Sequence, residues 1–185
     1  MTTELTLKQD GSRLAIETTA KGMLAKLAHD LTILSRDFSC TATLTDAGAD
    51  VTVRVPVRGL HVDGVRKRGV VDRSVLSSSD KSDIERKIRE EVLTSSEVVV
   101  TASVADVPSD GTRSASTSAT VEVGGKKAKA KVSATITALP DGIKASGRAT
   151  VSLDSLAIPP VKGPLGAFRV DDAIEVVFDL AFARA

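Results

Sequence analysis

The sequence has very few aromatic residues, and this shortage narrows what the protein can bind. Aromatic side chains make up 2% of the 185 residues, with four phenylalanines and no tryptophan or tyrosine. Proteins that bind nucleic acid usually combine stacking aromatic side chains with a basic stripe. The net charge of +1 provides no strong positive field either. We therefore expect no nucleic-acid partner.

Several other features are absent. Cys40 is the only cysteine, which excludes an internal disulfide and a zinc site built from several thiolates. No stretch approaches the roughly 20 apolar residues of a membrane-spanning helix, so we expect no stable membrane insertion. The first residues lack the basic and then apolar segments of a signal peptide. This favours a cytoplasmic protein, or a periplasmic one if a leader has been removed.

No catalytic signature stands out in the sequence. There is no Gly-x-Ser-x-Gly motif, no glycine-rich phosphate loop and no pairing of cysteine and histidine as nucleophile and base. We therefore expect a protein that is not an enzyme and that needs no cofactor.

What the sequence does contain is a strong alternation of apolar and polar residues, typical of strands that bury one face. The clearest example is the hairpin predicted over residues 127–153, with a Pro-Asp-Gly turn at 140–142. Similar runs occur at residues 38–44, 51–57, 98–104, 114–123 and 174–182, and another begins after a turn predicted at Asp10-Gly11. Many short, evenly spaced strands predict an all-β antiparallel barrel of about eight strands, with residues 1–185 forming one domain.

One segment breaks the alternation and predicts an amphipathic helix over residues 79–93. Its apolar residues recur every four positions, at Ile84, Ile88 and Val92. Ser82 and Glu85 have the spacing of a capping box. We expect this helix on the outside of the barrel or across one end, and a shorter helical turn at residues 22–28.

The inward face of the predicted hairpin carries unusually small side chains, namely Ala128, Ala130, Ala134, Ala145, Gly147 and Ala149. A barrel of about eight strands normally fills its interior with side chains. Small side chains on two neighbouring strands would leave an apolar ligand cavity, widest at this hairpin. Alternatively, they face bulky partners such as Phe178 and Phe182, and the interior is filled.

Two histidine–aspartate pairs are the best candidates for chemistry. His29 and Asp30 are adjacent and would point to opposite faces of a strand, which favours a structural histidine near the barrel mouth or a contact to a polar head group. His61 and Asp63 would share one face, as metal ligands must. A third ligand would have to come from His29 or Asp30, so a polar loop is the simpler interpretation and we expect no metal site.

Two further segments could act at an opening of the barrel. The basic run Arg66-Lys67-Arg68 is either solvated or placed to meet a phosphate-bearing head group. Residues 163–168, with the sequence Gly-Pro-Leu-Gly-Ala-Phe, form either a connecting loop or a lid that includes Phe168.

The order of these elements resembles that of the YceI-like family. The resemblance covers nearly the whole chain and is carried by residues 26–33, with the sequence Lys-Leu-Ala-His-Asp-Leu-Thr-Ile, and by residues 37–43, 79–93, 152–158 and 168–176. Many members carry an Arg-Asp-x-His-Leu stretch before the helix, whereas residues 71–76 of this chain contain no histidine. The resemblance implies an extended lipocalin-like barrel that binds polyisoprenoid-type lipids.

The leading hypothesis is a non-enzymatic protein that transports or sequesters a long-chain apolar ligand, such as an isoprenoid or a quinone, inside the barrel. We expect the ligand-binding residues to be Leu14, Ile16, His29, Phe38, Val132, Ala134, Ala149, Val151, Phe168 and Phe178. The alternative is an interaction or structural module with a filled barrel. A homodimer is compatible with either hypothesis.

Overall fold

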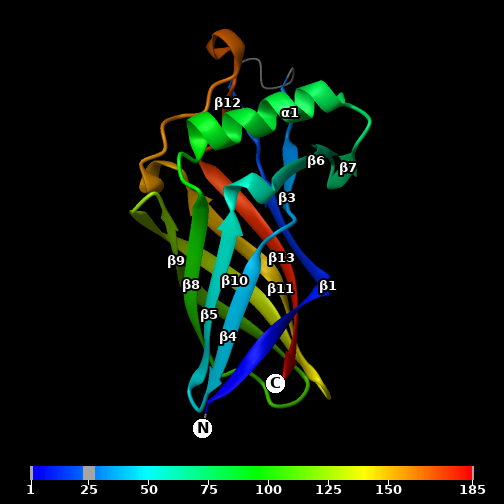
Figure 1. The fold of residues 1–185 in the computed structure, drawn as a ribbon, viewed down its shortest axis with the longest axis vertical. Coiled ribbons are helices and arrows are strands. Elements are labelled where there is room, and N and C mark those ends of the chain that lie inside the picture. The colour runs from blue at the N-terminus through cyan, green and yellow to red at the C-terminus, as the bar shows by residue number, and fades with distance from the viewer. Residues whose placement is uncertain (1, 23–27, 185) are drawn as a thin grey trace.

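The computed structural model describes residues 2–22 and 28–184 of the chain. In this part of the chain, eight antiparallel strands form a closed barrel, because β1 pairs with β13 (Figure 1). The barrel strands are β1 (Thr3–Glu17), β4 (Ser39–Thr45), β5 (Gly48–Pro56), β8 (Glu97–Ala105), β9 (Thr112–Val123), β10 (Lys126–Leu139), β11 (Gly142–Ser152) and β13 (Ala173–Arg184). The predicted all-β antiparallel barrel is confirmed.

Smaller strands extend the upper end of the barrel, in the orientation of Figure 1. The lower part of β1 pairs with β4, whereas its upper part, residues 14–17, pairs with β3. The additional strands are β3 (Leu31–Ser35), β6 (Leu60–Lys67) and β7 (Val70–Asp72), together with β2 (Ala20–Lys21) and β12 (Arg169–Val170), which pair with each other. Both chain ends lie at the opposite, lower end of the barrel.

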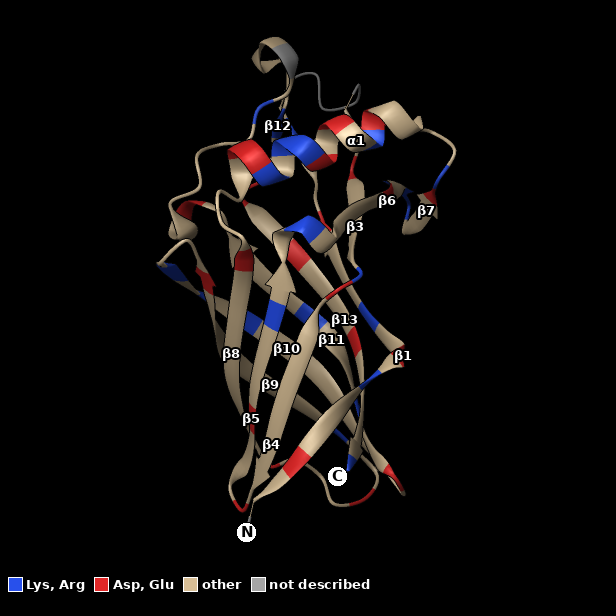
Figure 2. Ribbon diagram, in the orientation of Figure 1, with Lys and Arg blue, Asp and Glu red and all other residues tan. Residues whose placement is uncertain are grey.

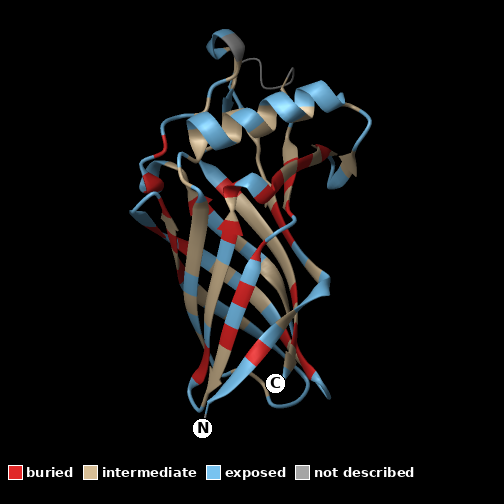
Figure 3. Ribbon diagram, in the orientation of Figure 1, coloured by how far each residue is buried: buried red, intermediate tan, exposed pale blue. Residues whose placement is uncertain are grey.

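The hairpin of β10 and β11 follows the predicted alternation closely. Leu139 pairs with Gly142 across a two-residue turn, and the register then continues without a break to Lys131 and Thr150. Gly142 is required here because a Cβ atom at this position would collide with the carbonyl oxygen of Phe182 on β13. Along such strands, buried and exposed residues alternate (Figure 3).

The predicted helix is present as α1 (Ser78–Lys87), which continues into a π-helical turn (Ile88–Val92). The capping box predicted at Ser82 was wrong, because it forms at Ser77 and Asp80 instead. Ser77 Oγ accepts a hydrogen bond from the Asp80 N–H at 3.1 Å, and the Asp80 carboxylate accepts one from the Ser77 N–H at 2.9 Å. Hydrogen bonds from Ser77 also hold the pKa of Asp80 below its ordinary value. Of the turn predicted at 22–28, residues 23–27 lie outside the described residues.

Two other local predictions were wrong. The chain does not turn at Asp10-Gly11: β1 continues through this point with a register shift between Lys8 and Arg13 against β13. Gly11, at φ +89°, allows the extra residues to bulge out of the ladder. Residues 61–63 do not form a loop but belong to β6, which pairs with β3.

Helix α1 lies across the upper end of the barrel and carries charged residues along its length (Figures 1 and 2). None of its described residues is fully buried, and polar contacts hold it to the sheet. The Glu85 carboxylate accepts a hydrogen bond from the Val62 N–H at 2.8 Å and from the Arg89 guanidinium at 3.0 Å. Lys81 donates to the carbonyl oxygen of Asp63 at 3.0 Å.

The Glu85→Ala variant is expected to lower the free energy of unfolding by about 2 kcal/mol, because the Val62 N–H loses its acceptor. For a chain of this length, that change corresponds to a decrease of roughly 4–8 °C in Tm. Thermal unfolding followed by circular dichroism measures it. Glu90→Ala, at an exposed position of the same helical segment, is the control, and an equal loss in both variants would contradict the role given to Glu85.

Candidate functional site: an apolar cavity in the barrel

The barrel encloses a cavity of about 230 Å³. All eight barrel strands contribute to its wall, and among the described residues that line it only Thr117 is polar. Thr117 Oγ1 donates a hydrogen bond to the carbonyl oxygen of Ser103 at 2.8 Å, so its donor is already satisfied within the sheet. The cavity can therefore accommodate a hydrocarbon chain, but its wall offers almost no hydrogen-bonding group to a polar or charged ligand.

Small side chains on neighbouring strands create this space. The alanines of the wall are Ala42, Ala49, Ala102, Ala115, Ala119, Ala130, Ala134, Ala145 and Ala149. Ala134 and Ala145 stand inside the barrel and yet are only half-buried, because they face open volume rather than packed side chains. The filled-barrel interpretation therefore does not hold for Ala134 and Ala145, although Ala128 lies in the packed core and not on the cavity wall.

One aromatic ring shapes the middle of the cavity. Phe178 on β13 pairs with Gly147 on β11, which in turn pairs with Ala134 on β10. The ring lies against Gly147, since a Cβ atom at that position would be 2.8 Å from Phe178 Cζ. Phe178 thus fills the space that the glycine leaves, and it projects into the cavity as part of the wall.

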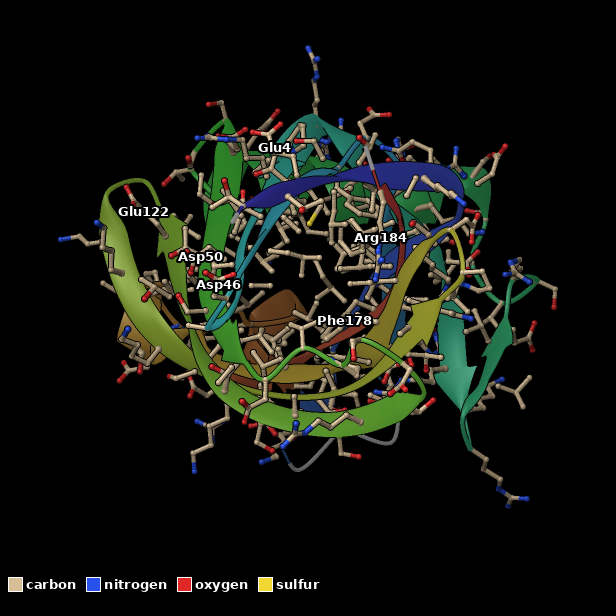
Figure 4. All side chains as sticks on the ribbon, turned by 90° about the horizontal axis from the view of Figure 1, so that it is seen from below. Glu4, Asp46, Asp50, Glu122, Phe178 and Arg184 are labelled. Carbon is tan, nitrogen blue, oxygen red and sulfur yellow. The ribbon has the colours of Figure 1, made fainter. Side chains whose placement is uncertain are left out.

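The two ends of the cavity differ. At the upper end, Leu60 and Leu93 line the cavity, and Ile84 and Ile88 of the helix pack against the same apolar core. At the lower end, the cavity meets a polar pocket formed by the β4–β5 turn, the β8–β9 loop and Arg184, and Leu44 and Val107 line both spaces. Figure 4 shows the barrel from this end and labels Asp46 and Arg184, which line the polar pocket. At this end the polar pocket therefore lies between the apolar cavity and solvent.

The structure places seven of the ten residues proposed as ligand-binding on the cavity wall, namely Leu14, Ile16, Val132, Ala134, Ala149, Val151 and Phe178. The other three lie elsewhere. Phe38 precedes β4 and is 3% exposed within the packed core. His29 is exposed in the segment before β3. Phe168 packs its ring against Gly163 of its own loop and does not line the cavity.

Several residues of the cavity wall were not predicted from the sequence. Leu93 follows the helical segment, Val107 follows β8, and Leu5 lies on β1 before the bulge. The alternation at residues 98–104 pointed to Val98, Val100, Ala102 and Val104, which all line the cavity. No signal in the sequence identifies Leu93 and Val107, because neither lies within an alternating run.

The histidine–aspartate pairs do not converge. His61 Nδ1 lies 3.5 Å from Glu85 Oε2, and Asp63 instead forms a two-point ion pair with Arg73 at 2.7 and 2.9 Å. Asp30 accepts a hydrogen bond from the Ala20 N–H at 2.8 Å. In the described part of the chain, no group of three or more His, Cys, Asp or Glu side chains is arranged to hold a metal ion.

The basic run and the single cysteine also lie away from the open end. Arg66 donates to the carbonyl oxygen of Thr18 at 3.1 Å, and Arg68 occupies the turn between β6 and β7 at the upper end. Cys40 is buried, and the loss of solvation raises the pKa of its thiol to about 12. At neutral pH it therefore stays protonated and packs as a small apolar side chain.

Two solved structures resemble this one. A polyisoprenoid-binding domain from Saccharophagus degradans, implicated in plant cell wall breakdown, aligns over 100% of both chains with a TM-score of 0.65 and 12% sequence identity. BcnA from Burkholderia cenocepacia aligns over 95% of this chain and 98% of its own, also with a TM-score of 0.65 and 12% identity. No protein-family model and no curated protein matches the sequence.

These likenesses concern the fold, since sequence identity is low.

No helix in the described residues has both the length and the apolar character needed to cross a bilayer. The chain has the same fold as the two structures above, a closed antiparallel barrel with a helix at one end, as its resemblance to the YceI-like family predicts.

Proposed function

We propose that this protein is a divergent YceI-like protein that binds a long-chain apolar ligand inside the barrel and transports or sequesters it without changing it chemically. The observation that carries the proposal is the cavity, whose described lining residues are all apolar except Thr117. The solved polyisoprenoid-binding domain with the same fold supports a ligand of this kind. The wall residues proposed from the sequence, among them Leu14, Val132 and Phe178, would contact its chain.

The shape of the cavity favours a linear chain over a compact ring system. Its volume of about 230 Å³ lies below the range of roughly 300–1,000 Å³ usual for ligand pockets. Its wall nevertheless includes β11 from Ile143 to Val151, a span of about 26 Å along a strand. With a strand tilt of about 40°, this corresponds to about 20 Å along the barrel axis. A narrow space of this length fits a hydrocarbon chain.

The energy for binding would come from removing this chain from water. Each methylene group that is buried contributes about 0.8 kcal/mol, from which the cost of ordering the chain is subtracted. No polar group of the ligand has to be desolvated in this process if all of its polar atoms remain at the open lower end.

Native mass spectrometry of the purified protein, followed by organic extraction, tests the proposal. We expect a co-purifying lipid, or, after delipidation, saturable uptake of a linear lipid at one molecule per barrel. A delipidated protein that takes up no long-chain lipid at all would overturn the proposal.

A further inference from the structure

The apolar inward faces of several strands end in charged residues at the lower rim. On β13, the inward series Val176, Phe178, Leu180 and Phe182 continues at the next inward position with Arg184. Arg184 pairs with Leu5, whose side chain lines the cavity, and this pairing places both residues on the inner face. Arg113 on β9 is likewise inward, because it pairs with the cavity residue Ile136.

Both arginines line the polar pocket that adjoins the cavity, but they differ in their partners. Arg113 Nη2 lies 3.5 Å from Asp106 Oδ2, so its charge is already compensated. The side chain of Arg184 makes no ion pair or hydrogen bond with any described residue. It is exposed and lies at the edge of the opening in Figure 4. The N–H groups of the Arg184 guanidinium therefore have no partner among the described residues, and they lie in the polar pocket next to the lower end of the cavity.

The other charges of the pocket limit what Arg184 can attract. Arg113 and Asp106 compensate each other, and besides Arg184 the other ionisable side chains that line this pocket among the described residues, Asp46 and Asp110, add no positive charge. An anion with two or more charges would therefore meet one available guanidinium, which compensates only one of its charges. A single carboxylate matches one guanidinium in charge and can accept two parallel hydrogen bonds from it.

We propose that Arg184 binds the carboxylate of a long-chain monocarboxylic acid whose hydrocarbon tail occupies the cavity. This inference rests on the proposed function, since the tail must enter the barrel. The polar end of the ligand stays at the lower rim, because the wall offers it no partner deeper in the barrel. Phosphorylated and diphosphorylated lipids of the same chain length bind less well, since no second open cation compensates their additional charge, which lies in the same pocket as Asp110.

Three probes with the same tail test this inference: hexadecanoate, hexadecanol and hexadecyl phosphate, titrated into delipidated protein by displacement of a fluorescent lipid. The pH is kept above about 7.5, where the phosphate monoester carries two charges. We expect hexadecanoate to bind about tenfold more tightly than hexadecanol, as a hydrogen-bonded ion pair predicts, and more tightly than the phosphate. Arg184→Gln is expected to remove the preference for the acid without weakening hexadecanol.

Arg13→Gln is the matched control, because Arg13 is an exposed arginine of β1, which pairs with β13. It should leave all three affinities unchanged. Equal binding of acid and alcohol by the unmodified protein, tightest binding of the phosphate, or no effect of Arg184→Gln would overturn the role of Arg184 and leave the proposed function standing. If the fluorescent lipid binds but none of the three probes displaces it, only the inference is overturned; if the delipidated protein takes up no long-chain lipid at all, the proposed function is overturned as well.

Discussion

Replacing Ala134 with phenylalanine is expected to lower the affinity for a long-chain lipid by about 100-fold. Ala134 lies on the cavity wall in the middle of β10, beside Gly147 and the ring of Phe178. A second ring at this level would block the channel and prevent three or four methylene groups of the ligand from being buried. At about 0.8 kcal/mol for each methylene, the loss is about 3 kcal/mol, which is roughly the stated factor. Titration of the delipidated variant with the fluorescent lipid measures it.

Thr135→Phe is the control for this experiment, since Thr135 is the next residue of the same strand and is exposed on the outer face. It should leave lipid affinity unchanged. Ala134→Phe should also keep its Tm, because the added ring enters open space rather than packed core. Undiminished binding by a folded Ala134→Phe protein would contradict an internal ligand, and equal losses in both variants would point to a ligand on the surface.

The Gly147→Ala variant is expected to lose about 3 kcal/mol of stability, although only one methyl group is added. That Cβ atom would collide with the carbonyl oxygen of Ser133 and lie 2.8 Å from the Cα atom of Ala134, and both are backbone atoms of β10. This collision can be relieved only if β10 and β11 move apart in the middle of the barrel. A loss of this size corresponds to a decrease of roughly 6–12 °C in Tm, which thermal unfolding by circular dichroism would detect.

A double variant separates the two possible origins of this strain. Adding Phe178→Ala to Gly147→Ala removes the ring but not the backbone collision, so stability should not be restored. Ser146→Ala, at the neighbouring position of β11, is the control and should change Tm little. Recovery in the double variant would show that the aromatic ring, rather than the approach of β10, requires the glycine.

The parts of the fold that could be predicted are those in which one face of a strand is buried and the other is exposed. β10 and β11 satisfy this condition along most of their length, and the hairpin was predicted nearly to the residue. β3 does not, because Thr32 and Ile33 are adjacent and both buried, so its sequence shows no alternation. β6 was missed because the register shift opposite Thr32 and Ile33 interrupts its pattern.

The candidate site could be predicted only in part, because a pattern within one strand does not say what lies opposite. The inward alanines of β10 and β11 were identified, but whether they face space or bulky residues depends on strands far away in the sequence. Phe178 covers Gly147 on the adjacent strand and leaves the rest of the cavity open. Arg184 continues the inward periodicity of β13. Its place in a polar pocket next to the cavity could not be predicted, because that pocket is formed by the β4–β5 turn and the β8–β9 loop.

The pairing of β1 with β13 also determines when the barrel can close during translation. Leu5 pairs with Arg184, so the barrel cannot close until nearly the whole described chain has been translated, which takes on the order of ten seconds or more. During that time, β1 presents an unpaired edge on which other nascent chains could assemble. The bulge between Lys8 and Arg13 interrupts this edge and places charged residues on either side of the interruption, and both features discourage aggregation of unpaired strands. If β1 adopts the same irregular backbone before β13 is made, we expect fewer contacts between nascent chains at this edge.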